Sequence, residues 1–416
     1  MLRLYQWLVI LATPFLKIHL RRRLARGKED PARLYERFGG ASLPRPKGKL
    51  VWIHAASVGE SVSVLKLIQD LTDQHPKIKI LLTTGTVTSA RLMAQRLPKS
   101  VIHQYIPLDV PNWIARFLDH WQPNHVMILE SELWPNMLSA IKKRNLSCWL
   151  VNARLSPKSY RRWRYLKGAF SSLMSSFDKI FTPTSETLER LKDLGVNQAE
   201  LSVNLKYTTD PLPLDIQEVT ALKKSLKRPI IAVVSTHAGE ESFILESIQV
   251  LRKEYPNLLI ILAPRHPDRA ETVLGILDDQ RMSVARRSLR EVPSQKTDVW
   301  LIDTIGDLGL VYSLAPVCVL GGSFEAIGGH NPIEPYNLGC IVVQGKHTFN
   351  FTDTNQILAS ALTEVTTQTE LSKALLSLYG DLTLVETKKA FGQQVLDSQK
   401  RGLEILIQEI VEAVSC

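Results

Sequence analysis

Apolar and polar positions alternate along this chain in blocks that predict strands and helices in turn. Short apolar runs such as 50–54 (LVWIH) and 258–263 (LLIILA) are typical of strands buried in a parallel sheet. A turn with glycine or polar residues follows each run, and then comes a segment of helical pattern, as in 61–71. This order predicts an α/β fold in which parallel sheets have helices on both faces.

The alternation pauses once and then restarts. Residues 210–214 (DPLPL) contain two prolines, which is typical of a linker. We therefore predict two Rossmann-like domains, at residues 29–212 and 213–416, the second ending in a long helix over about 380–414. Ligands of such sheets bind at the carboxyl ends of the strands, so two facing domains would enclose a cleft there.

The first residues have a different pattern. Residues 4–16 are apolar except for Gln6 and Thr13, and Lys17 and three arginines at 21–23 follow. The apolar stretch is shorter than the roughly 20 residues that span a bilayer, and no signal-peptide cleavage site follows it. We predict that residues 1–28 form a membrane anchor helix that lies in the interface or barely spans, with its basic flank at the cytoplasmic leaflet. A buried N-terminal helix is the alternative.

The charge distribution narrows the class of partner. The net charge is +10, and residues 17–28 and 133–177 contain basic residues but no acids. Such stretches attract anionic lipid, phosphorylated substrates or nucleic acid. Nucleic acid is disfavoured, because the basic residues are not interleaved with aromatic residues on strands and acids follow several strands. The four cysteines have no CxxC spacing, so neither a disulfide framework nor a zinc site is expected.

Candidate chemical groups follow the predicted strands. Glu60 comes after Gly59 at a predicted helix start, where the helix dipole would keep it ionised and where it could act as a general base. Glu130 ends an apolar run, with Glu132 two residues later, and the sequence does not decide which one acts. Lys206 and Arg265 are cations after strands, suited to a phosphate or a carboxylate.

A glycine-rich stretch at 321–335 (GGSFEAIGGHNPIEP) follows another apolar run. Asn331 is a plausible helix N-cap, with Pro332 at the first helical position and Glu334 at the third. Backbone N–H groups there would face a phosphate above the glycines. The chain has no P-loop, no G-x-G-x-x-G after its first strand and no H-E-x-x-H, so we expect chemistry without a metal or a cofactor.

Six motifs in order resemble one family, the 3-deoxy-D-manno-octulosonic acid (Kdo) transferases of Gram-negative bacteria. They are HAASVGE (54–60), ESELWPN (130–136), NLKY (204–207), STHAGEE (235–241), PRHPDR (264–269) and GGSFEAIGGHNPIEP (321–335). The resemblance implies a GT-B glycosyltransferase at the cytoplasmic side of the bacterial inner membrane. It also implies that the first domain binds a lipid A precursor (lipid IVA), that the second binds CMP-Kdo, and that transfer is an inverting single displacement releasing CMP.

The resemblance also implies roles for individual residues. Glu60 matches the general base, and Glu130 and Lys206 match groups that stabilise the transition state. The residues that match CMP contacts are Arg265, His266, Gly306, Asp307, Leu308, Asn331, Pro332, Ile333 and Glu334.

Three alternatives remain open at this point. The first is another GT-B transferase or a sugar-nucleotide epimerase that uses a uridine nucleotide. The second is a nucleic-acid-binding protein that uses the basic stretches, and the third is a scaffold without activity.

Overall fold

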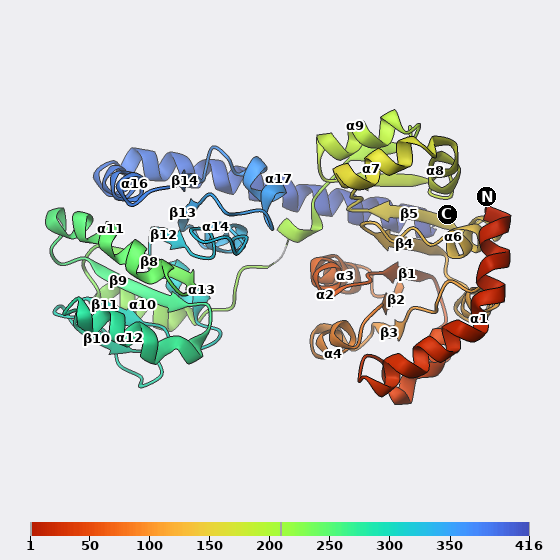
Figure 1. The fold of residues 1–416 in the computed structure, drawn as a ribbon, viewed down its shortest axis with the longest axis horizontal. Helices are drawn as coiled ribbons and strands as arrows, with labels where there is room; N and C mark the ends of the chain where they lie inside the picture. The colour runs from red at the N-terminus through yellow and green to blue at the C-terminus, as the bar shows by residue number, and fades with distance from the viewer. Residues whose placement is uncertain (1, 209, 416) are drawn as a thin grey trace. The chain divides into compact units, whose positions relative to one another are not determined.

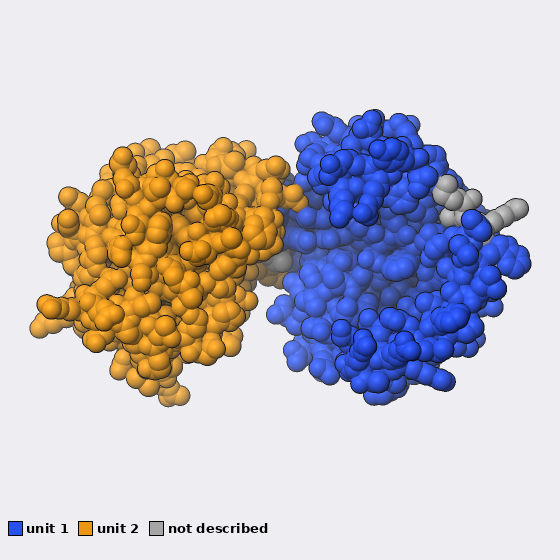
Figure 2. Space-filling model, in the orientation of Figure 1, with its two compact units in different colours: residues 1–209, 399–416 blue, residues 210–398 orange. Residues whose placement is uncertain are grey.

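The computed structural model describes residues 2–208 and 210–415 and divides the chain into two compact units. Unit 1 comprises residues 1–209 and 399–416, and unit 2 comprises residues 210–398 (Figure 2). Each unit has a parallel sheet with helices on both faces, as the alternating pattern predicts (Figure 1).

The sheet of unit 1 has the strand order β3-β2-β1-β4-β5-β6-β7. Its strands are β1 (Leu50–His54), β2 (Lys79–Thr84), β3 (Ile102–Tyr105), β4 (His125–Leu129), β5 (Ser147–Val151), β6 (Lys179–Thr182) and β7 (Ala199–Leu201). Side chains of β1 alternate between two cores, because successive residues of a strand point to opposite faces. Leu50 and Trp52 belong to one hydrophobic cluster, and Val51 and Ile53 belong to the other. The sheet is therefore buried on both sides, which explains the unbroken apolar runs.

The helices that begin in unit 1 precede, connect or follow these strands. They are α1 (Leu2–Ala25), η1 (Pro31–Phe38), α2 (Val58–Ser63), α3 (Leu65–Gln74), α4 (Val87–Arg96), α5 (Pro111–Trp121), α6 (Pro135–Lys143), α7 (Pro157–Arg164), α8 (Lys167–Met174), α9 (Ser185–Asp193) and η2 (Leu205–Tyr207).

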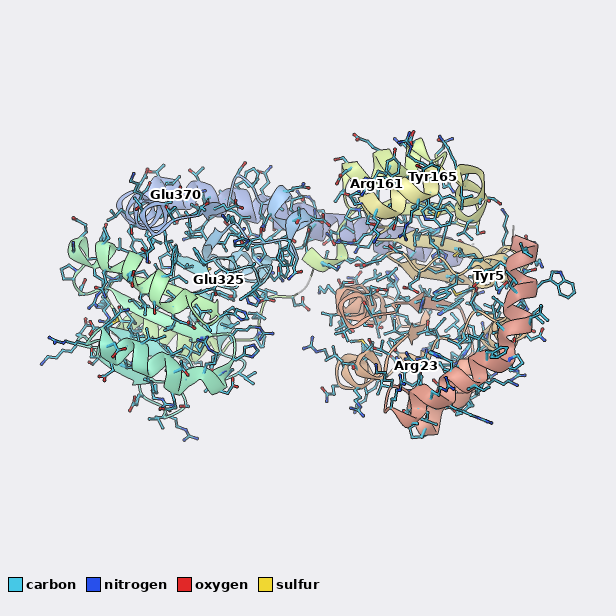
Figure 3. The ribbon with its side chains drawn as sticks, viewed as in Figure 1. Tyr5, Arg23, Arg161, Tyr165, Glu325 and Glu370 are labelled. Carbon is cyan, nitrogen blue, oxygen red and sulfur yellow. The ribbon has the colours of Figure 1, made fainter. Side chains whose placement is uncertain are left out.

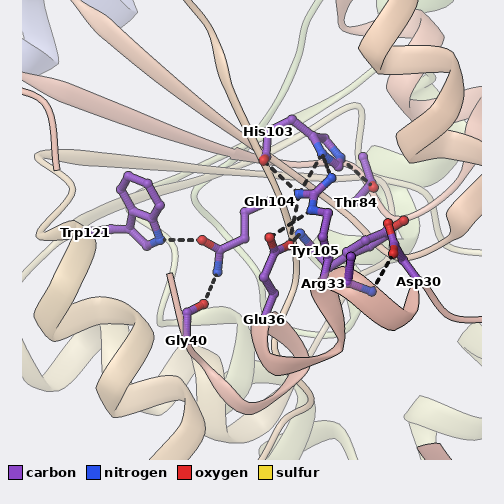
Figure 4. A network of polar contacts seen from close by, with 10 residues as sticks. Asp30, Arg33, Glu36, Gly40, Thr84, His103, Gln104, Tyr105 and Trp121 are labelled. Carbon is purple, nitrogen blue, oxygen red and sulfur yellow. Dashed lines mark hydrogen bonds and ion pairs between the residues drawn. The ribbon is translucent and has the colours of Figure 1, made fainter. Parts of the chain in front are cut away.

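A polar network fixes η1 to the edge strand β3 (Figure 4). Arg33 donates to both oxygens of Glu36 at 2.9 Å and to the carbonyl oxygen of His103 at 2.9 Å. Glu36 is fully buried and also accepts the backbone N–H of Tyr105 at 2.7 Å. Burial, with Arg33 nearby, lowers the pKa of His103 to about 4. The network therefore couples the segment after α1 to the sheet.

The sheet of unit 2 has the order β10-β11-β9-β8-β12-β13-β14. Its strands are β8 (Ile230–Thr236), β9 (Leu259–Pro264), β10 (Val284–Arg286), β11 (Val299–Leu301), β12 (Val317–Leu320), β13 (Ile341–Gly345) and β14 (Thr363–Val365). The helices that begin in this unit are α10 (Ile216–Ser225), α11 (Glu240–Glu254), η3 (Pro267–Arg269), α12 (Ala270–Asp279), α13 (Leu308–Leu314), α14 (Ile333–Asn337), α15 (Thr352–Ile357), α16 (Gln368–Gly380) and α17 (Leu382–Ser415).

The C-terminal residues belong to unit 1, although the sequence pattern assigns all of 213–416 to the second domain. Helix α17 starts in unit 2, and residues 399–416 pack in unit 1. The physical reason is apolar burial: Leu403, Leu406 and Ile410 join the same hydrophobic cluster as Val51. Lys179 also pairs with Glu409 at 2.7 Å.

Helix α1 packs against unit 1 with part of its surface only. Leu20 is buried, and the Tyr5 hydroxyl donates to Asp109 at 3.1 Å, whereas Trp7 and Phe15 are 67% and 72% exposed. The alternative of a buried N-terminal helix is therefore wrong, since most of the apolar surface of α1 lies outside the core. Within residues 2–208 and 210–415, no helix combines the length and the apolar character needed to cross a bilayer.

Candidate active site

The predicted site residues divide between the two units, so each group is described within its own unit. Glu60, Glu130 and Lys206 lie in unit 1. The residues expected to contact CMP, from Arg265 to Glu334, lie in unit 2.

Glu60 is held at the first turn of α2 by the residues just before it. Its Oε2 accepts the backbone N–H of Ala56 at 2.8 Å, and its Oε1 accepts the hydroxyl of Ser57 at 2.7 Å. Ser57 is the N-cap of α2 and accepts the N–H of Glu60 in return. The carboxyl group is thus fixed by one hydrogen bond at each oxygen, and the contact with Ser57 is reciprocal.

Burial controls the ionisation of Glu60. The side chain is largely removed from solvent, and this desolvation raises the pKa of Glu60, while the contacts from Ser57 and Ala56 oppose the rise. The charges of Glu130 and Glu132 raise this pKa further. Burial thus opposes the helix dipole, and the ionised state expected for Glu60 from the sequence stays a prediction. A carboxylate with a raised pKa is a stronger base once it is ionised.

Glu130 and Lys206, which the sequence does not place together, are in direct contact. Nζ of Lys206 lies 2.8 Å from Oε1 of Glu130, and Nε of Arg154 lies 3.6 Å from the same oxygen. Glu130 has a φ of 55°, a left-handed conformation that is uncommon for a residue other than glycine. Asn152, at the end of the neighbouring strand, has a φ of 58°. Such strain at two strand ends is typical of functional sites.

Glu132 takes a different direction from Glu130. Its Oε2 accepts the indole N–H of Trp134 at 2.6 Å and lies 3.9 Å from Nε2 of His54. The proximity of His54, together with the contact from Trp134, lowers the pKa of Glu132 against the effect of burial. The sequence does not decide which of Glu130 and Glu132 acts, but the structure gives the two side chains separate surroundings. Glu130 pairs with Lys206, and Glu132 lies near His54.

A pocket of about 480 Å³ lies beside Glu60, and we call it the Glu60 pocket. Its walls come from the ends of β1 and β2, from the start of α6 and from the inner side of α1; the lining residues include His19, Leu20, Arg23, His54, Ser57, Glu60, Leu108, Asp109, Glu132, Trp134 and Met137. The lining combines apolar side chains with charged side chains of both signs, which suits an amphiphilic ligand with hydroxyl groups. The C-terminal part of α1, with His19, Leu20 and Arg23, is therefore part of the pocket wall.

In unit 2, the glycine-rich stretch is held by Glu240, a residue to which the sequence gave no role. This carboxylate is almost fully buried. It accepts backbone N–H groups of His237 at 2.9 Å, of Gly322 at 2.7 Å and of Phe324 at 3.0 Å. The signal that might have identified Glu240 is its place at the start of a helix after a strand-end glycine, where an acid can cap neighbouring N–H groups.

His330, which belongs to this stretch, packs against His237, which follows β8. The rings of His237 and His330 lie 6° from parallel, and their Nε2 atoms are 3.1 Å apart. Burial lowers the pKa of His330 to about 4, so the ring is neutral near pH 7. His266 packs edge-on to His237, with ring centroids 5.8 Å apart. Arg265, beside it, is exposed and donates its backbone N–H to Thr236 at 3.0 Å.

The turn at 331–334 is close to the prediction but shifted by one residue. Helix α14 begins at Ile333, and Pro332 precedes it, so the placement of Pro332 at the first helical position is wrong. Asn331 nevertheless accepts the N–H of Ile333 at 3.1 Å, as a capping residue does. Burial raises the pKa of Glu334, and the charge of Arg265 opposes this, so these two predicted CMP contacts lie near each other.

The remaining predicted CMP loop has its own contacts. Gly306 is exposed with a φ of 100°, and Leu308 is the first residue of α13. Asp307 pairs with Arg287 at 3.0 Å and accepts the hydroxyl of Thr304. The carboxylate of Asp307 therefore has partners within the protein, and a contact of Gly306, Asp307 or Leu308 with a nucleotide stays a prediction.

Within the described parts of the chain, no cluster of three or more His, Cys, Asp or Glu residues is arranged to hold a metal ion.

Comparison with known proteins gives the family. Residues 32–209 match the family model of the 3-deoxy-D-manno-octulosonic-acid transferase (kdotransferase). The chain is 35% identical over 390 residues to the 3-deoxy-D-manno-octulosonic acid transferase of Haemophilus influenzae, covering 92% of this chain and 91% of that protein.

Solved structures with low sequence identity share the fold. A glycosyltransferase from Rickettsia africae has a TM-score of 0.56 at 12% identity and covers 89% of this chain and 98% of its own. A UDP-GlcNAc 2-epimerase from Neisseria meningitidis has a TM-score of 0.58 at 13% identity and covers 88% and 100%. These similarities support the two-domain α/β architecture of GT-B type. Epimerases and glycosyltransferases both have this architecture, and the family match decides between these two classes of enzyme. The chain belongs to the 3-deoxy-D-manno-octulosonic acid transferase family of glycosyltransferases.

Proposed function

We propose that this protein transfers Kdo from CMP-Kdo to a lipid A precursor, lipid IVA, by an inverting single displacement that releases CMP. The reaction would be a step of lipopolysaccharide core biosynthesis. Family membership supports the transfer of Kdo, and the Glu60 pocket is the observation that supports the acceptor. A lining of apolar and charged side chains, with a fixed carboxylate among them, suits a phosphorylated lipid that presents a hydroxyl group.

Glu60 removes the proton from the attacking hydroxyl group of the acceptor. Its raised pKa brings its basicity closer to what a general base needs at neutral pH. Because Ser57 and Ala56 hold both carboxylate oxygens, the base is oriented before the substrate arrives. The oxygen freed of its proton attacks the anomeric carbon of Kdo, and CMP departs with the electron pair of the broken bond.

Glu130 and Lys206 stabilise charge in the transition state. The Kdo ring becomes positively charged as the bond to CMP breaks, and a carboxylate close to it lowers the barrier. Lys206 contacts Glu130 at 2.8 Å and so fixes the position of that carboxylate. In unit 2, Arg265, His266, Gly306, Asp307, Leu308 and residues 331–334 are the proposed CMP contacts.

The main test is the substitution of the base. We expect Glu60→Ala and Glu60→Gln to abolish Kdo transfer, measured by mass spectrometry of lipid IVA after incubation with CMP-Kdo, and to leave CMP-Kdo binding nearly unchanged. Loss of CMP-Kdo binding together with activity would instead mark Glu60 as structural. Release of UDP from a uridine donor, without release of CMP from CMP-Kdo, would refute the proposed donor.

We further propose that α1 holds the protein on the cytoplasmic face of the bacterial inner membrane. Trp7, Leu11 and Phe15 are among its exposed apolar side chains, and Lys17 and the arginines at 21–23 follow. A helix of this kind binds in the interface of an anionic bilayer. Figure 3 shows Tyr5 and Arg23 on this helix, and Arg161 and Tyr165 on the basic segment around α7.

Deletion of residues 1–23 tests the attachment. We expect the shortened protein to move from the membrane fraction to the supernatant after cell lysis and centrifugation. If it stays with the membranes, the basic surface around α7 is the main attachment and the role given to α1 is refuted.

A further inference from the structure

Unit 2 contains two histidines, His237 and His330, that the proposed mechanism does not use. His237 follows β8, and His330 belongs to the glycine-rich stretch that follows β12. These two strands are neighbours in the sheet, so the rings meet at its carboxyl edge, where ligands of parallel sheets bind (Figure 1). We call the two side chains the histidine pair.

One hydrogen lies between the two rings, whichever ring supplies it. Their Nε2 atoms are 3.1 Å apart. The rings are 6° from parallel, and their centroids are 5.3 Å apart, which exceeds the Nε2–Nε2 distance by about two ring radii. The two Nε2 atoms therefore point at each other in nearly one plane, and one of them donates while the other accepts.

This arrangement leaves the histidine pair able to gain a proton. When both rings are neutral, the ring that donates through Nε2 has a free lone pair at Nδ1, and the ring that accepts has its hydrogen at Nδ1. A proton can add to that lone pair without breaking the bond between the rings. This holds for either direction of the shared hydrogen bond, so it does not depend on which tautomer each ring adopts.

A ligand can reach the Nδ1 side of the histidine pair. Both side chains are half-buried, and neither Nδ1 atom is among the buried polar atoms that lack a partner. Within residues 210–415, no hydrogen bond to either Nδ1 atom is present, and the bond between the rings uses Nε2 only. The pair thus presents one donor and one acceptor to whatever binds at this edge of the sheet.

Backbone N–H groups near the pair are already occupied. Those of His237, Gly322 and Phe324 donate to the buried carboxylate of Glu240. An anion at this position therefore needs donors from side chains. Arg265, which follows the neighbouring strand β9, is exposed and forms no ion pair within 4 Å in the described part of unit 2.

The charges around the histidine pair do not favour an anion unless a proton is gained. The nearby carboxyl groups are Glu240 and Glu241 of α11 and Glu334 of α14. The nearby cations are Arg265 and Arg269, and Arg269 is bound to Glu241. Glu334 lies close enough to Arg265 for their charges to interact. A phosphate would add negative charge to a region in which acids already outnumber cations.

The histidine pair is neutral near pH 7 in the protein without a ligand. Burial lowers the pKa of His330 to about 4, and burial also lowers the pKa of His237. The charges of Arg265 and His266 lower both values further, whereas the charge of Glu240 opposes the fall. A negative charge placed beside the rings acts in the same direction as Glu240 and favours the protonated form.

We propose that the histidine pair binds the phosphate group of CMP-Kdo together with Arg265 and takes up one proton as the phosphate binds. The proton comes from solvent and adds to the free Nδ1, so both Nδ1 atoms then have a hydrogen to donate. A hydrogen bond from an ionised donor to a phosphate is roughly twice as strong as one between neutral groups. As the bond between CMP and Kdo breaks, the phosphate gains further negative charge, which the protonated pair stabilises. The inference rests on the proposed function, because it takes CMP-Kdo as the ligand.

Titration calorimetry of the full chain with CMP-Kdo, in two buffers with different heats of ionisation, counts the protons taken up. The phosphate of CMP-Kdo is a diester that stays singly ionised near neutral pH, so a proton taken up enters the protein. We expect an uptake of about half a proton at pH 6 and less than about a tenth at pH 8, because an opposite charge nearby favours protonated histidine. This measurement uses the unchanged protein and does not depend on how a variant folds.

Glutamine variants assign the proton to the histidine pair. Glutamine keeps a hydrogen-bond donor but cannot gain a charge. The double variant His237→Gln/His330→Gln should abolish the uptake and weaken CMP-Kdo binding by about tenfold, and each single variant should have part of this effect. His75→Gln, at a half-buried histidine of unit 1, is the matched control and should change neither the uptake nor the affinity.

Three results would overturn the proposal. They are binding of CMP-Kdo to the unchanged protein at pH 6 without uptake of a proton, uptake that persists in the double variant, and an unchanged affinity of the double variant for CMP-Kdo. None of them affects the proposed function, whose test is the transfer of Kdo to lipid IVA. If the unchanged protein binds no CMP-Kdo at all, the proposed donor is refuted, and this inference with it.

Discussion

Replacing Glu240 with glutamine removes the charge that holds the glycine-rich stretch and barely changes the size of the side chain. In the structure, Oε2 accepts the N–H groups of His237 and Gly322, at 2.9 and 2.7 Å. Oε1 accepts those of Phe324 and Glu325, at 3.0 and 3.4 Å. Glutamine has only one acceptor oxygen, so its NH₂ group must face two of these donors in either orientation.

The expected loss follows from these contacts. Hydrogen bonds to a charged group contribute about 1.5 to 3 kcal/mol each, and two of the four are lost. The amide will turn so as to give up the weaker pair, which includes the 3.4 Å contact of Glu325. We therefore expect the free energy of unfolding of unit 2 to fall by about 3 kcal/mol, the lower end of the range.

Urea unfolding followed by circular dichroism measures this loss, and calorimetric titration with CMP-Kdo measures its effect on the site. Affinity for CMP-Kdo should fall as well, because the displaced stretch continues into the proposed CMP contacts Asn331 and Glu334. Glu254→Gln is the control, since Glu254 lies exposed at the other end of the same helix. If Glu240→Gln loses no more stability than Glu254→Gln, the view that this carboxylate holds the stretch is refuted.

Other buried groups yield three more predictions. Gly322→Ala places a Cβ 2.7 Å from a histidine ring at a φ of 67°, so it should destabilise the protein more than Gly339→Ala, where φ is 74° and the space is open; urea unfolding compares the two. Burial raises the pKa of Asp109 to about 6, so its contribution to stability should fall as the pH rises from about 4 to 6, and Asp109→Asn should flatten this part of a stability profile. Lys206→Ala should lower kcat by about 10²-fold or more, and adding Glu130→Ala should lower it little further, as stopped assays of CMP release would show.

The strands could be predicted from the sequence because both faces of each sheet are buried. Residues 50–54 and 317–320 are apolar throughout, and each forms a strand in the middle of its sheet. The local structure around two predicted site residues could also be predicted, because neighbouring residues in the sequence determine it. Asn331 caps the turn before α14, and Glu60 lies in the first turn of α2, as the order of residue types suggests.

Contacts between distant residues could not be predicted in the same way. Glu240 binds N–H groups more than 80 residues away, and no spacing rule connects them. Glu130 and Glu132 look alike in the sequence, but Glu130 has a positive φ, which redirects its side chain from the regular alternation of a strand. The same holds for residues 399–416, whose apolar positions show that they are buried without showing in which unit.

Residues 399–416 pack in unit 1, so a mutation that truncates the protein near its C-terminus affects the unit that contains the N-terminus. A stop codon near position 398 would leave unit 2 with all of its own residues, but it would remove Leu403, Leu406 and Ile410 from the core beside β1. The half that contains Glu60 would therefore lose its integrity although the lesion lies at the opposite end of the gene. A frameshift close to the terminus would thus inactivate the protein by unfolding the part that was synthesised first.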